Sequence, residues 1–382
     1  MIDNFIVHYD EIGLKGANRS YFEQMLMNNI KAKLGSKVKR IKRESGQITV
    51  VANNSEDSKE IKQGLTEVSG IAYFSPAIIC KLDMDDIKKQ SIEFIKNEEF
   101  TTFKIDAKRH DKHNDLDSRQ INNELGDHVR TTLDKTAKMK DPDLALKVEI
   151  TRSNAYLSYE NIQGVGGIPI RRKQKVVTLL SGGFDSPVAA QLMMKRGCEV
   201  IFVHFQNDNL VKKSVENKIL KLTEQLSKYQ LQTKLYIVPF EELQKEIIMK
   251  VPPKIRMLIY RRFMIKISED IAKQNRAFFL VTGDSLSQVA SQTIENLRAT
   301  YAKSDMQILS PLIGMDKKEI IAISRKIGTH DISKLAYCDV CSYFLPKGPE
   351  LKASTKLLDD LQATVDPEIV ARTTESAIIK EF

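Results

Sequence analysis

The stretch that most constrains how this chain can fold is residues 176–189, VVTLLSGGFDSPVA. Residues 176–180 form an apolar run with the length of a buried strand. Ser181, Gly182 and Gly183 follow as a turn, in which the glycines let the backbone bend sharply and approach a ligand. An apolar segment with helical spacing comes after Pro187. The stretch therefore predicts a strand, a glycine turn and a helix N-terminus, where exposed N–H groups and the helix dipole favour an anion.

The spacing of this turn excludes a Walker loop, because the GxxxxGK[ST] pattern and its lysine are missing. Taken alone, Ser-Gly-Gly is also a common turn and helix cap. The whole string SGGFDS after a strand resembles the pyrophosphate-binding loop of the PP-loop ATP pyrophosphatases. In that family the loop holds the β- and γ-phosphates while ATP is cut between α and β, which leaves an adenylated substrate. The resemblance implies that Asp185 serves Mg²⁺ and leaving-group chemistry, since a carboxylate beside phosphates needs a cation between them.

Length and composition limit the other possibilities. A chain of 382 residues is long enough for two or three domains with apolar cores. The net charge of +9, spread along the chain, favours a polyanionic partner such as nucleic acid. There is no apolar run of membrane length and no signal-peptide pattern, so we expect no membrane association and a cytoplasmic location. Four cysteines are too few for a disulfide scaffold in a chain of this length.

The first half of the chain predicts two α+β domains and a linker. Residues 1–80 have the order β-α-β-β-α-β, which is typical of a ferredoxin-like unit. Residues 81–165 predict a helix, a strand, a second helix and a hairpin. Residues 166–175 combine Gly and Pro with a basic cluster, and we expect them to be a linker in which the cations serve a hinge or an RNA contact.

Residues 176–382 predict an α/β domain. Four apolar runs, at 176–180, 199–205, 233–238 and 278–282, alternate with helical segments, which is the pattern of a doubly wound parallel sheet. Ligands of such sheets bind beyond the carboxyl ends of the strands. Because Ser181, His204 and Gly283 lie at three predicted strand ends, we expect them to meet at one crevice. The last part of the chain is expected to be mostly helical.

Four segments of the N-terminal half carry a more specific resemblance: EIGLKGANRSYF, GIAYFSPA, TFKIDAKRHDKHNDLDSRQINNELG and KVEI. They look like the ferredoxin-like and THUMP domains that precede a PP-loop domain in the ThiI family of tRNA sulfurtransferases, the tRNA 4-thiouridine synthetases. The resemblance covers about residues 5–350 in the order of that family. It implies ATP and Mg²⁺ as cofactors, tRNA as substrate, and a cysteine desulfurase or other sulfur donor as partner. It is compatible with a homodimer and does not decide the oligomeric state.

The same resemblance implies where the nucleotide binds. Taken singly, His204 is more often a packed histidine, and Arg261 is one cation on a charged helix face. The run TGDSLSQVASQT, residues 282–293, matches the family closely and departs from it at Ser287, where glycine is usual. The resemblance assigns nucleotide contacts to Leu179, Leu180, Ser181, Gly182, Gly183, Phe184, Ser186, His204, Phe205, Arg261, Gly283 and Gln292.

Two further motifs are expected to carry chemistry. In PLIGMDKKEI, residues 311–320, the resemblance favours Lys317 over Lys318 as the lysine that neutralises charge on the leaving pyrophosphate. By itself Asp-Lys-Lys-Glu is a common helix start. Cys338 and Cys341 form a CxxC, which is redox-active, metal-binding or coincidental, and no second pair nearby completes a zinc site. Cys80 and Cys198 lie in apolar settings where packing explains them better.

The Tyr-Cys context of Cys338 matches the cysteine that carries a persulfide in the ThiI family, and related sulfurtransferases have paired cysteines here, which would include Cys341. Asp185, Lys317, Cys338 and Cys341 are therefore the predicted catalytic residues. Long members of the family carry a C-terminal rhodanese domain with another active cysteine, to which the resemblance ties thiazole synthesis for thiamine. No cysteine follows Cys341, so we expect the short form.

These features predict an ATP-dependent tRNA sulfurtransferase that adenylates O4 of a uridine, at position 8 by resemblance, and replaces this oxygen by persulfide sulfur. One alternative is a PP-loop thiolase or ligase of another base, in which the CxxC holds an iron–sulfur cluster. The other is a tRNA-binding protein with an inactive nucleotide domain. The sequence leaves open the immediate sulfur donor, the cysteine that bears the persulfide, and which basic residues contact tRNA.

Overall fold

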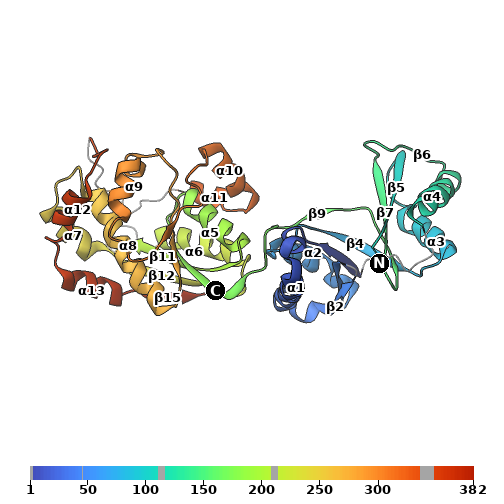
Figure 1. The fold of residues 1–382 in the computed structure, drawn as a ribbon, viewed down its shortest axis with the longest axis horizontal. Coiled ribbons are helices and arrows are strands. Elements are labelled where there is room, and N and C mark those ends of the chain that lie inside the picture. The colour runs from blue at the N-terminus through green and yellow to red at the C-terminus, as the bar shows by residue number, and fades with distance from the viewer. Residues whose placement is uncertain (1–2, 45, 111–116, 208–213, 336–347) are drawn as a thin grey trace. The chain divides into compact units, whose positions relative to one another are not determined.

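The computed structural model describes residues 3–44, 46–110, 117–207, 214–335 and 348–382. The chain forms two compact units, Met1–Pro169 and Ile170–Phe382 (Figure 1). Residues 171–175, expected in a linker, instead begin the strand β10 (Arg171–Leu179). The backbone of this basic stretch pairs with β11 (Cys198–Gln206) while its side chains stay mostly exposed or half-buried, so hydropathy alone could not reveal the strand. None of the helices in the described residues combines the length and apolarity that a membrane span needs.

The first half of unit 1 has the predicted order β-α-β-β-α-β, which confirms the ferredoxin-like arrangement. Its elements are β1 (Asn4–His8), α1 (Arg19–Leu34), β2 (Val38–Glu44), β3 (Gln47–Ala52), α2 (Ser58–Glu67) and β4 (Tyr73–Cys80). The apolar sides of α1 and α2 pack on β1 and β3 through Leu26, Ile30, Ile61 and Leu65. A 3₁₀ segment between β1 and α1, η1 (Glu11–Asn18), was not predicted from the sequence.

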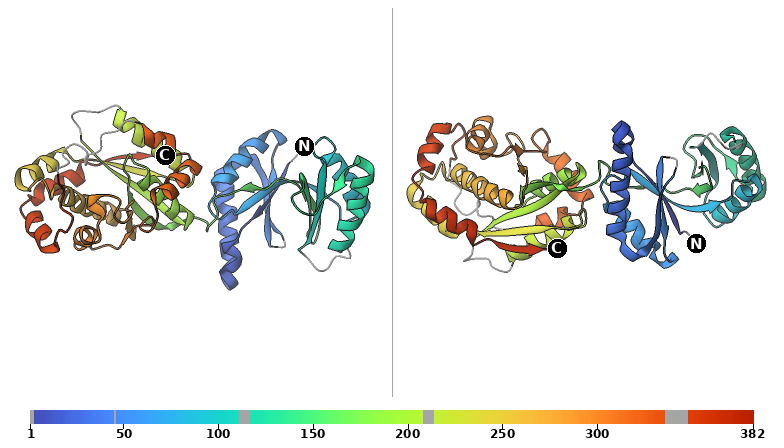
Figure 2. Two further views of the ribbon diagram at one scale, coloured as in Figure 1. Left: turned by 90° about the horizontal axis from the view of Figure 1, so that it is seen from above. Right: turned by 60° about the horizontal axis from the view of Figure 1, so that its bottom comes forward.

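The second half of unit 1 continues the same sheet. It contains α3 (Met84–Ile95), β5 (Thr102–Arg109), α4 (Ser118–Leu133), β6 (Thr136–Ala137), β7 (Leu144–Ile150), β8 (Ala155–Ser158) and β9 (Ile162–Gln163). Strand β4 joins the halves, because its first residues pair with β1 and its last three pair with β8. Helices α3 and α4 pack on β5, β7 and β8, and Figure 2 shows the two helix pairs of this unit, each against its own part of the sheet.

A buried carboxylate ties the two halves of unit 1 together. Glu149 on β7 is 5% exposed; one of its oxygens lies 2.8 Å from His110 Nε2 and the other 3.2 Å from His8 Nε2 on β1. Burial alone would raise the pKa of Glu149, but the hydrogen bond from His110 and the contact with His8 outweigh it and lower this pKa from 4.5 to about 2.

This shift predicts acid sensitivity of unit 1. Because the folded-state pKa of Glu149 lies below its unfolded value of 4.5, its contribution to stability is present above pH 4.5 and disappears as the pH falls toward 2. The full contribution is about 3 kcal/mol. We expect Glu149→Gln to remove this part of the pH dependence in urea unfolding followed by circular dichroism between pH 7 and 2.5. Glu160→Gln, at an exposed pair with Lys62, should keep the wild-type pH dependence. An equally steep acid loss in Glu149→Gln would refute the assignment.

Unit 2 has a six-stranded sheet in the order β14 (Ile308–Leu309), β13 (Phe279–Val281), β10, β11, β12 (Lys234–Pro239) and β15 (Ile378–Glu381). All neighbouring pairs are parallel except β12 with β15. The four predicted strands correspond to β10, β11, β12 and β13. The predicted helical tail contains α12 (Thr355–Gln362) and α13 (Pro367–Glu375), but it ends in β15, which the sequence did not indicate. Two residues of β15, Ile378 and Ile379, are exposed, so burial of apolar side chains does not explain this strand. It forms because β12 offers hydrogen-bond partners to its backbone.

Helices cover both faces of this sheet, which confirms the doubly wound fold (Figure 1). Successive residues of β10 point to opposite faces: Val176 packs with α5 (Asp185–Lys195) and α6 (Ser214–Ser227), and Val177 packs with α7 (Glu241–Lys250) and α8 (Arg256–Gln274). The loops that follow β10 and β13 therefore lie at one edge of the sheet, where the predicted site residues were expected.

Candidate active site

The glycine turn between β10 and α5 is closed by Ser186. The hydroxyl of Ser186 accepts a hydrogen bond from Ser181 N at 2.8 Å and lies 3.1 Å from Ser181 Oγ. Neither Gly182 nor Gly183 has a positive φ, so these positions do not need glycine for a left-handed backbone conformation. A Cβ on Gly183 would have only Ser181 Oγ nearby, at 3.5 Å. Gly183 therefore leaves open space beside the turn. A loop that lets a ligand approach its backbone closely needs such space.

Asp185, the first residue of α5, lies between two side chains from distant parts of the chain. Lys317 Nζ is 2.6 Å from Oδ1, and Gln288 Nε2 donates to Oδ2 at 2.9 Å. Lys317 is the first residue of α10 (Lys317–Lys326), and the side chain of Asp316 caps this helix. The ammonium of Lys317 lies 5.6 Å from the centre of the Phe184 ring. The structure thus brings together two of the predicted catalytic residues.

Gly283 is required by close packing. It follows β13, and a Cβ at this position would lie 2.7 Å from Ser186 N and 2.9 Å from Ser186 Cα. Because these are backbone atoms at the start of α5, any side chain would displace the glycine turn.

A cavity of about 420 Å³ opens beside this turn, within the size range of small-molecule sites. The predicted residues that line it are Leu179, Ser181, Asp185, Ser186, Arg261, Gly283 and Gln292. Other lining residues were not predicted, among them Lys254, Met257, Asp284 and Glu350. Asp284 comes three residues after the end of β13, within the quoted run at 282–293, so its place beyond a strand end was the signal that could have identified it.

Asp284 is the centre of a buried polar cluster in this wall. Arg261 Nη2 donates to Oδ2 at 2.5 Å, Gln292 Nε2 donates to Oδ1 at 2.9 Å, and the hydroxyl of Tyr301, on α9 (Ile294–Tyr301), also donates to Oδ2. Burial alone would raise the pKa of Asp284, but the charge and hydrogen bond of Arg261 keep this pKa below its usual value. Burial and the Asp284 charge raise the pKa of Tyr301 to about 12, so the phenol stays a donor. Two predicted nucleotide contacts, Arg261 and Gln292, are thus oriented by one carboxylate.

The structure buries the side chains of His204 and Phe205. His204 is 1% exposed, and its Nδ1–H donates to Leu180 O at 2.9 Å. Burial lowers the pKa of His204 to about 4, so the ring is neutral at physiological pH. The Phe205 ring packs edge-on against Phe240 in the core. Neither residue lines the cavity, nor do Leu180, Gly182, Gly183 and Phe184. In this arrangement the side chain of His204 anchors the backbone at the start of the glycine turn.

Cys338 and Cys341 lie outside the described residues, but the chain on both sides of them is at the site. Before them, Ser333 Oγ, on α11 (His330–Lys334), donates to Gly183 O at 3.0 Å. After them, Pro349 and Glu350 line the cavity. Burial raises the pKa of the Cys80 thiol to about 12 and also raises that of Cys198, so both thiols stay protonated, in agreement with a packing role.

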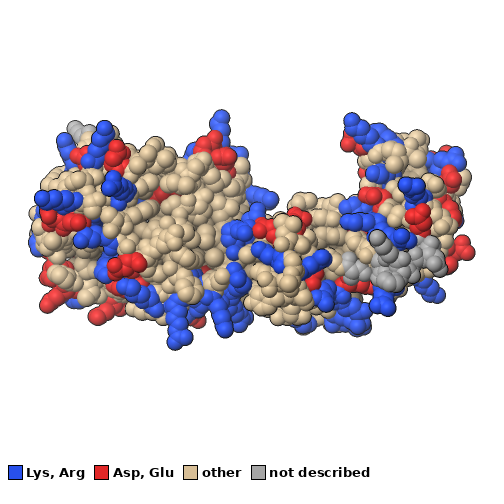
Figure 3. Space-filling view, viewed as in Figure 1, with Lys and Arg blue, Asp and Glu red and all other residues tan. Residues whose placement is uncertain are grey.

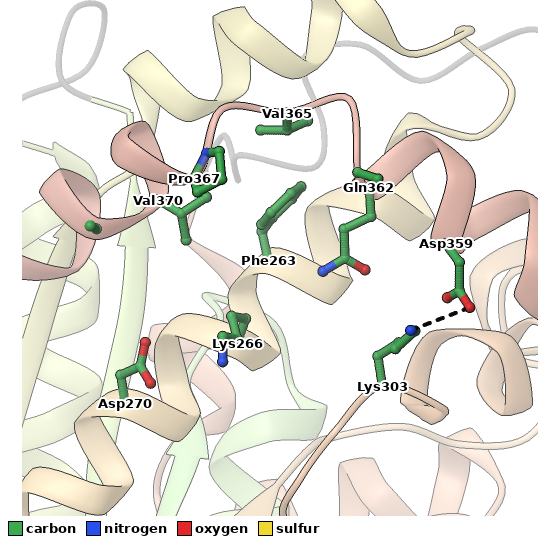
Figure 4. Close-up of a pocket in the computed structure, with 11 residues that line it drawn as sticks. Phe263, Lys266, Asp270, Lys303, Asp359, Gln362, Val365, Pro367 and Val370 are labelled. Carbon is green, nitrogen blue, oxygen red and sulfur yellow. Dashed lines mark ion pairs between the residues drawn. The ribbon is translucent and has the colours of Figure 1, made fainter.

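A second cavity, of about 490 Å³, lies between α8, α12 and α13 (Figure 4). Phe263, Val365, Pro367 and Val370 form its apolar wall, and Lys303 pairs with Asp359 at 3.6 Å on its rim. No residue of the glycine turn or of a strand end lines it, so the cavity beside Asp185 is the candidate nucleotide site. Among the described residues, no group of three or more His, Cys, Asp or Glu side chains is arranged to hold a metal ion by itself.

The backbone of Ser287 gives a test of this loop. Ser287 has a φ of 61°, in the left-handed region that favours glycine, which agrees with the glycine usual at this position in the family that the sequence resembles. We expect Ser287→Gly to raise the free energy of unfolding by up to about 1 kcal/mol in urea titrations. A lower unfolding free energy would show instead that the serine side chain stabilises the loop.

Comparison with known proteins agrees with this arrangement. The family model described as "Thiamine biosynthesis protein (ThiI)" matches residues 172–366, and models of the ThiI ferredoxin-like domain and the THUMP domain match residues 4–75 and 81–160. A probable tRNA sulfurtransferase of Thermoanaerobacter sp. (strain X514) is 41% identical over 92% of both chains. One of Geobacillus sp. (strain WCH70) is 37% identical over 99% of this chain and 96% of its own.

One solved structure is similar along the whole chain and another along most of it. A 4-thiouridine synthetase, in a crystal structure of its RNA complex with bound ATP, is 31% identical and covers 100% of both chains with a TM-score of 0.89. PH1313 from Pyrococcus horikoshii Ot3 is 25% identical, with a TM-score of 0.67 over 85% of this chain and 99% of its own. With these matches and the PP-loop geometry around Asp185, the chain belongs to the ThiI family, in which a PP-loop domain follows ferredoxin-like and THUMP domains.

Proposed function

We propose that this protein is an ATP-dependent tRNA sulfurtransferase that adenylates O4 of uridine 8 in tRNA and replaces it by sulfur, which gives 4-thiouridine. The observation that carries the proposal is the glycine turn with Asp185 and Lys317 beside a cavity of ligand size. The likeness, over its full length, to a 4-thiouridine synthetase bound to RNA and ATP supports the choice of substrates.

The residues of the cavity suit the binding of ATP. The hydroxyls of Ser181 and Ser186 and the N-terminus of α5 offer donors for the β- and γ-phosphates. Asp185 would hold Mg²⁺ together with phosphate oxygens and water, a donor set that this ion prefers and that needs no cluster of protein ligands. Bound there, Mg²⁺ would supply charge for the leaving pyrophosphate. Lys317, which now neutralises Asp185, can turn part of its charge to the same group.

The reaction then takes three steps. Uridine O4 attacks the α-phosphorus of ATP, and the bond to pyrophosphate breaks. The outer sulfur of a persulfide on Cys338 or Cys341 attacks C4, and AMP leaves with O4. The second thiolate attacks the inner sulfur, which releases 4-thiouridine and leaves a disulfide that a reductant must open. The described residues on both sides of these cysteines lie at the cavity, which supports this role.

Unit 1 would bind tRNA through backbone charge and shape, as RNA-binding domains usually do with folded RNA. Figure 3 shows Lys and Arg side chains spread over the visible face of each unit. A cysteine desulfurase or another donor would supply the sulfur, the protein would work in the cytoplasm with its tRNA substrate, and a homodimer is compatible with the proposal.

Mass spectrometry of nucleosides tests the function. Unmodified tRNA is incubated with the protein, ATP, Mg²⁺ and either a persulfide donor or sulfide. We expect 4-thiouridine at position 8 with the wild type. Cys338→Ser and Cys341→Ser should lose the product with the persulfide donor, and recovery with sulfide would show which thiol carries sulfur. Release of pyrophosphate without thiolated uridine would indicate that the substrate is another base. Iron and a brown colour after anaerobic purification would favour an iron–sulfur cluster on the CxxC. Binding of tRNA with neither product would favour the alternative of an RNA-binding protein with an inactive nucleotide domain.

A further inference from the structure

The second partner of Asp185 is Gln288, in the loop between β13 and α9. Its side-chain nitrogen donates to Asp185 Oδ2 at 2.9 Å, while Lys317 occupies Oδ1 at 2.6 Å. A carboxylate accepts hydrogen bonds, so the amide must face it with nitrogen. The other end of the amide, Gln288 Oε1, is buried and has no hydrogen-bond partner among the described residues.

The segments that carry Gln288 and Lys317 are bonded to each other. Ser285 Oγ donates to Met315 O at 2.9 Å, and Leu286 N donates to Ile313 O at 3.1 Å. Within the Gln288 loop, the left-handed Ser287 forms a backbone bond with Gln292 O at 2.9 Å. The loop and the segment before α10 thus form one frame that places a donor on each oxygen of Asp185.

We propose that Gln288 is a positioning residue that orients the carboxylate of Asp185 for its role with Mg·ATP. Without it, the carboxylate can rotate about its contact with Lys317. An amide suits this task because it donates a hydrogen bond without neutralising the carboxylate, whose charge is needed for a cation. The inference deepens the proposed function and depends on it for the identity of the reaction.

Two substitutions separate hydrogen bonding from packing. Gln288→Ala should lower kcat for tRNA-dependent pyrophosphate release about tenfold, with KM for ATP within about twofold at saturating Mg²⁺, because the carboxylate is held less well for the cation while the other contacts to ATP are kept. Gln288→Glu has the same shape but places a second carboxylate against Asp185 and should lower kcat by about a hundredfold or more. If Gln288 only filled space, Gln288→Ala would lower the melting temperature and leave kcat close to wild type, and that result would overturn the proposal.

Binding of Mn²⁺ as a probe for Mg²⁺, followed by electron paramagnetic resonance with ATP present, gives a readout independent of turnover. Gln288→Ala should weaken Mn²⁺ binding several-fold relative to wild type, and an unchanged affinity would contradict the proposal. The matched control is Gln225→Ala, at a half-buried glutamine whose amide donates to Ile327 O at 2.9 Å. It should lower the melting temperature and leave kcat and Mn²⁺ binding unchanged.

The same experiments distinguish this inference from the proposed function. Absence of 4-thiouridine with the wild type would refute the function, and the Mn²⁺ titrations would still rank the Gln288 variants. If wild type makes 4-thiouridine while Gln288→Ala and Gln225→Ala lose kcat equally, the function stands and the positioning role of Gln288 is wrong.

Discussion

Replacement of Asp185 by asparagine is expected to lower pyrophosphate release and 4-thiouridine formation by about a thousandfold or more. Asparagine has the same shape but no charge, so it holds a cation beside the phosphates far more weakly, and Lys317 loses the charged partner that lies at 2.6 Å. A thousandfold loss corresponds to about 4 kcal/mol of transition-state stabilisation, which is a normal share for a metal-bound charge in phosphoryl chemistry.

The measurement is single-turnover pyrophosphate release with saturating tRNA and ATP, next to thermal unfolding. The matched control is Asp331→Asn in α11, whose side chain is 94% exposed and pairs with His330 near the glycine turn. It should keep the wild-type rate. Retention of more than about a tenth of the wild-type rate by a folded Asp185→Asn protein would exclude Asp185 from the chemistry.

Replacement of Asp284 by alanine is expected to lower both stability and ATP affinity. Removal of this buried carboxylate breaks its ion pair with Arg261, which costs about 3 kcal/mol. For a unit of this size that corresponds to a melting temperature about 6–12 °C lower. Arg261 and Gln292 lose the group that orients them toward the cavity, so we expect ATP to bind at least about tenfold more weakly by titration calorimetry at a temperature where the variant is folded.

Asp359→Ala is the matched control for that prediction. Asp359 pairs with Arg262, the neighbour of Arg261 on α8, at 2.6 Å, but it lies beside the second cavity. Its loss should affect stability and leave ATP affinity at the wild-type value. Equal losses of ATP affinity in both variants would mean that any disturbance of α8 weakens the site, and that Asp284 has no specific role.

Much of the architecture was predictable from the sequence because its signals are local. The apolar run, glycine turn and helix around Asp185 are consecutive residues, so strand, turn and helix propensities act within one short segment. The order of strands and helices in residues 1–80 follows from the same local patterns, and the parallel sheet follows from alternation of strands and helices. Convergence of Ser181 and Gly283 on one crevice needed only the rule that parallel strands end at the same edge.

Where the sequence prediction was incomplete, the missing information is non-local. The strand at 171–175 and the terminal strand β15 exist because a neighbouring strand offers hydrogen-bond partners, whereas their own side chains are charged or exposed. The sequence also did not reveal that the position of His204 on a central strand buries its ring, which donates a hydrogen bond to Leu180 O, and the nucleotide contact assigned to this residue stays a prediction.

The sequence by itself determined the class of the protein: a PP-loop domain after two α+β domains, with Asp185 at the start of its helix and Lys317 at the start of another. Only the tertiary structure decided how that aspartate is held, because Gln288 lies 103 positions away from it and Lys317 132 positions away. It likewise decided that Asp284 orients Arg261 and Gln292. Such contacts depend on how distant segments fold back on one another, and the strength of a hydrogen bond or ion pair depends on burial, which no single stretch of sequence specifies.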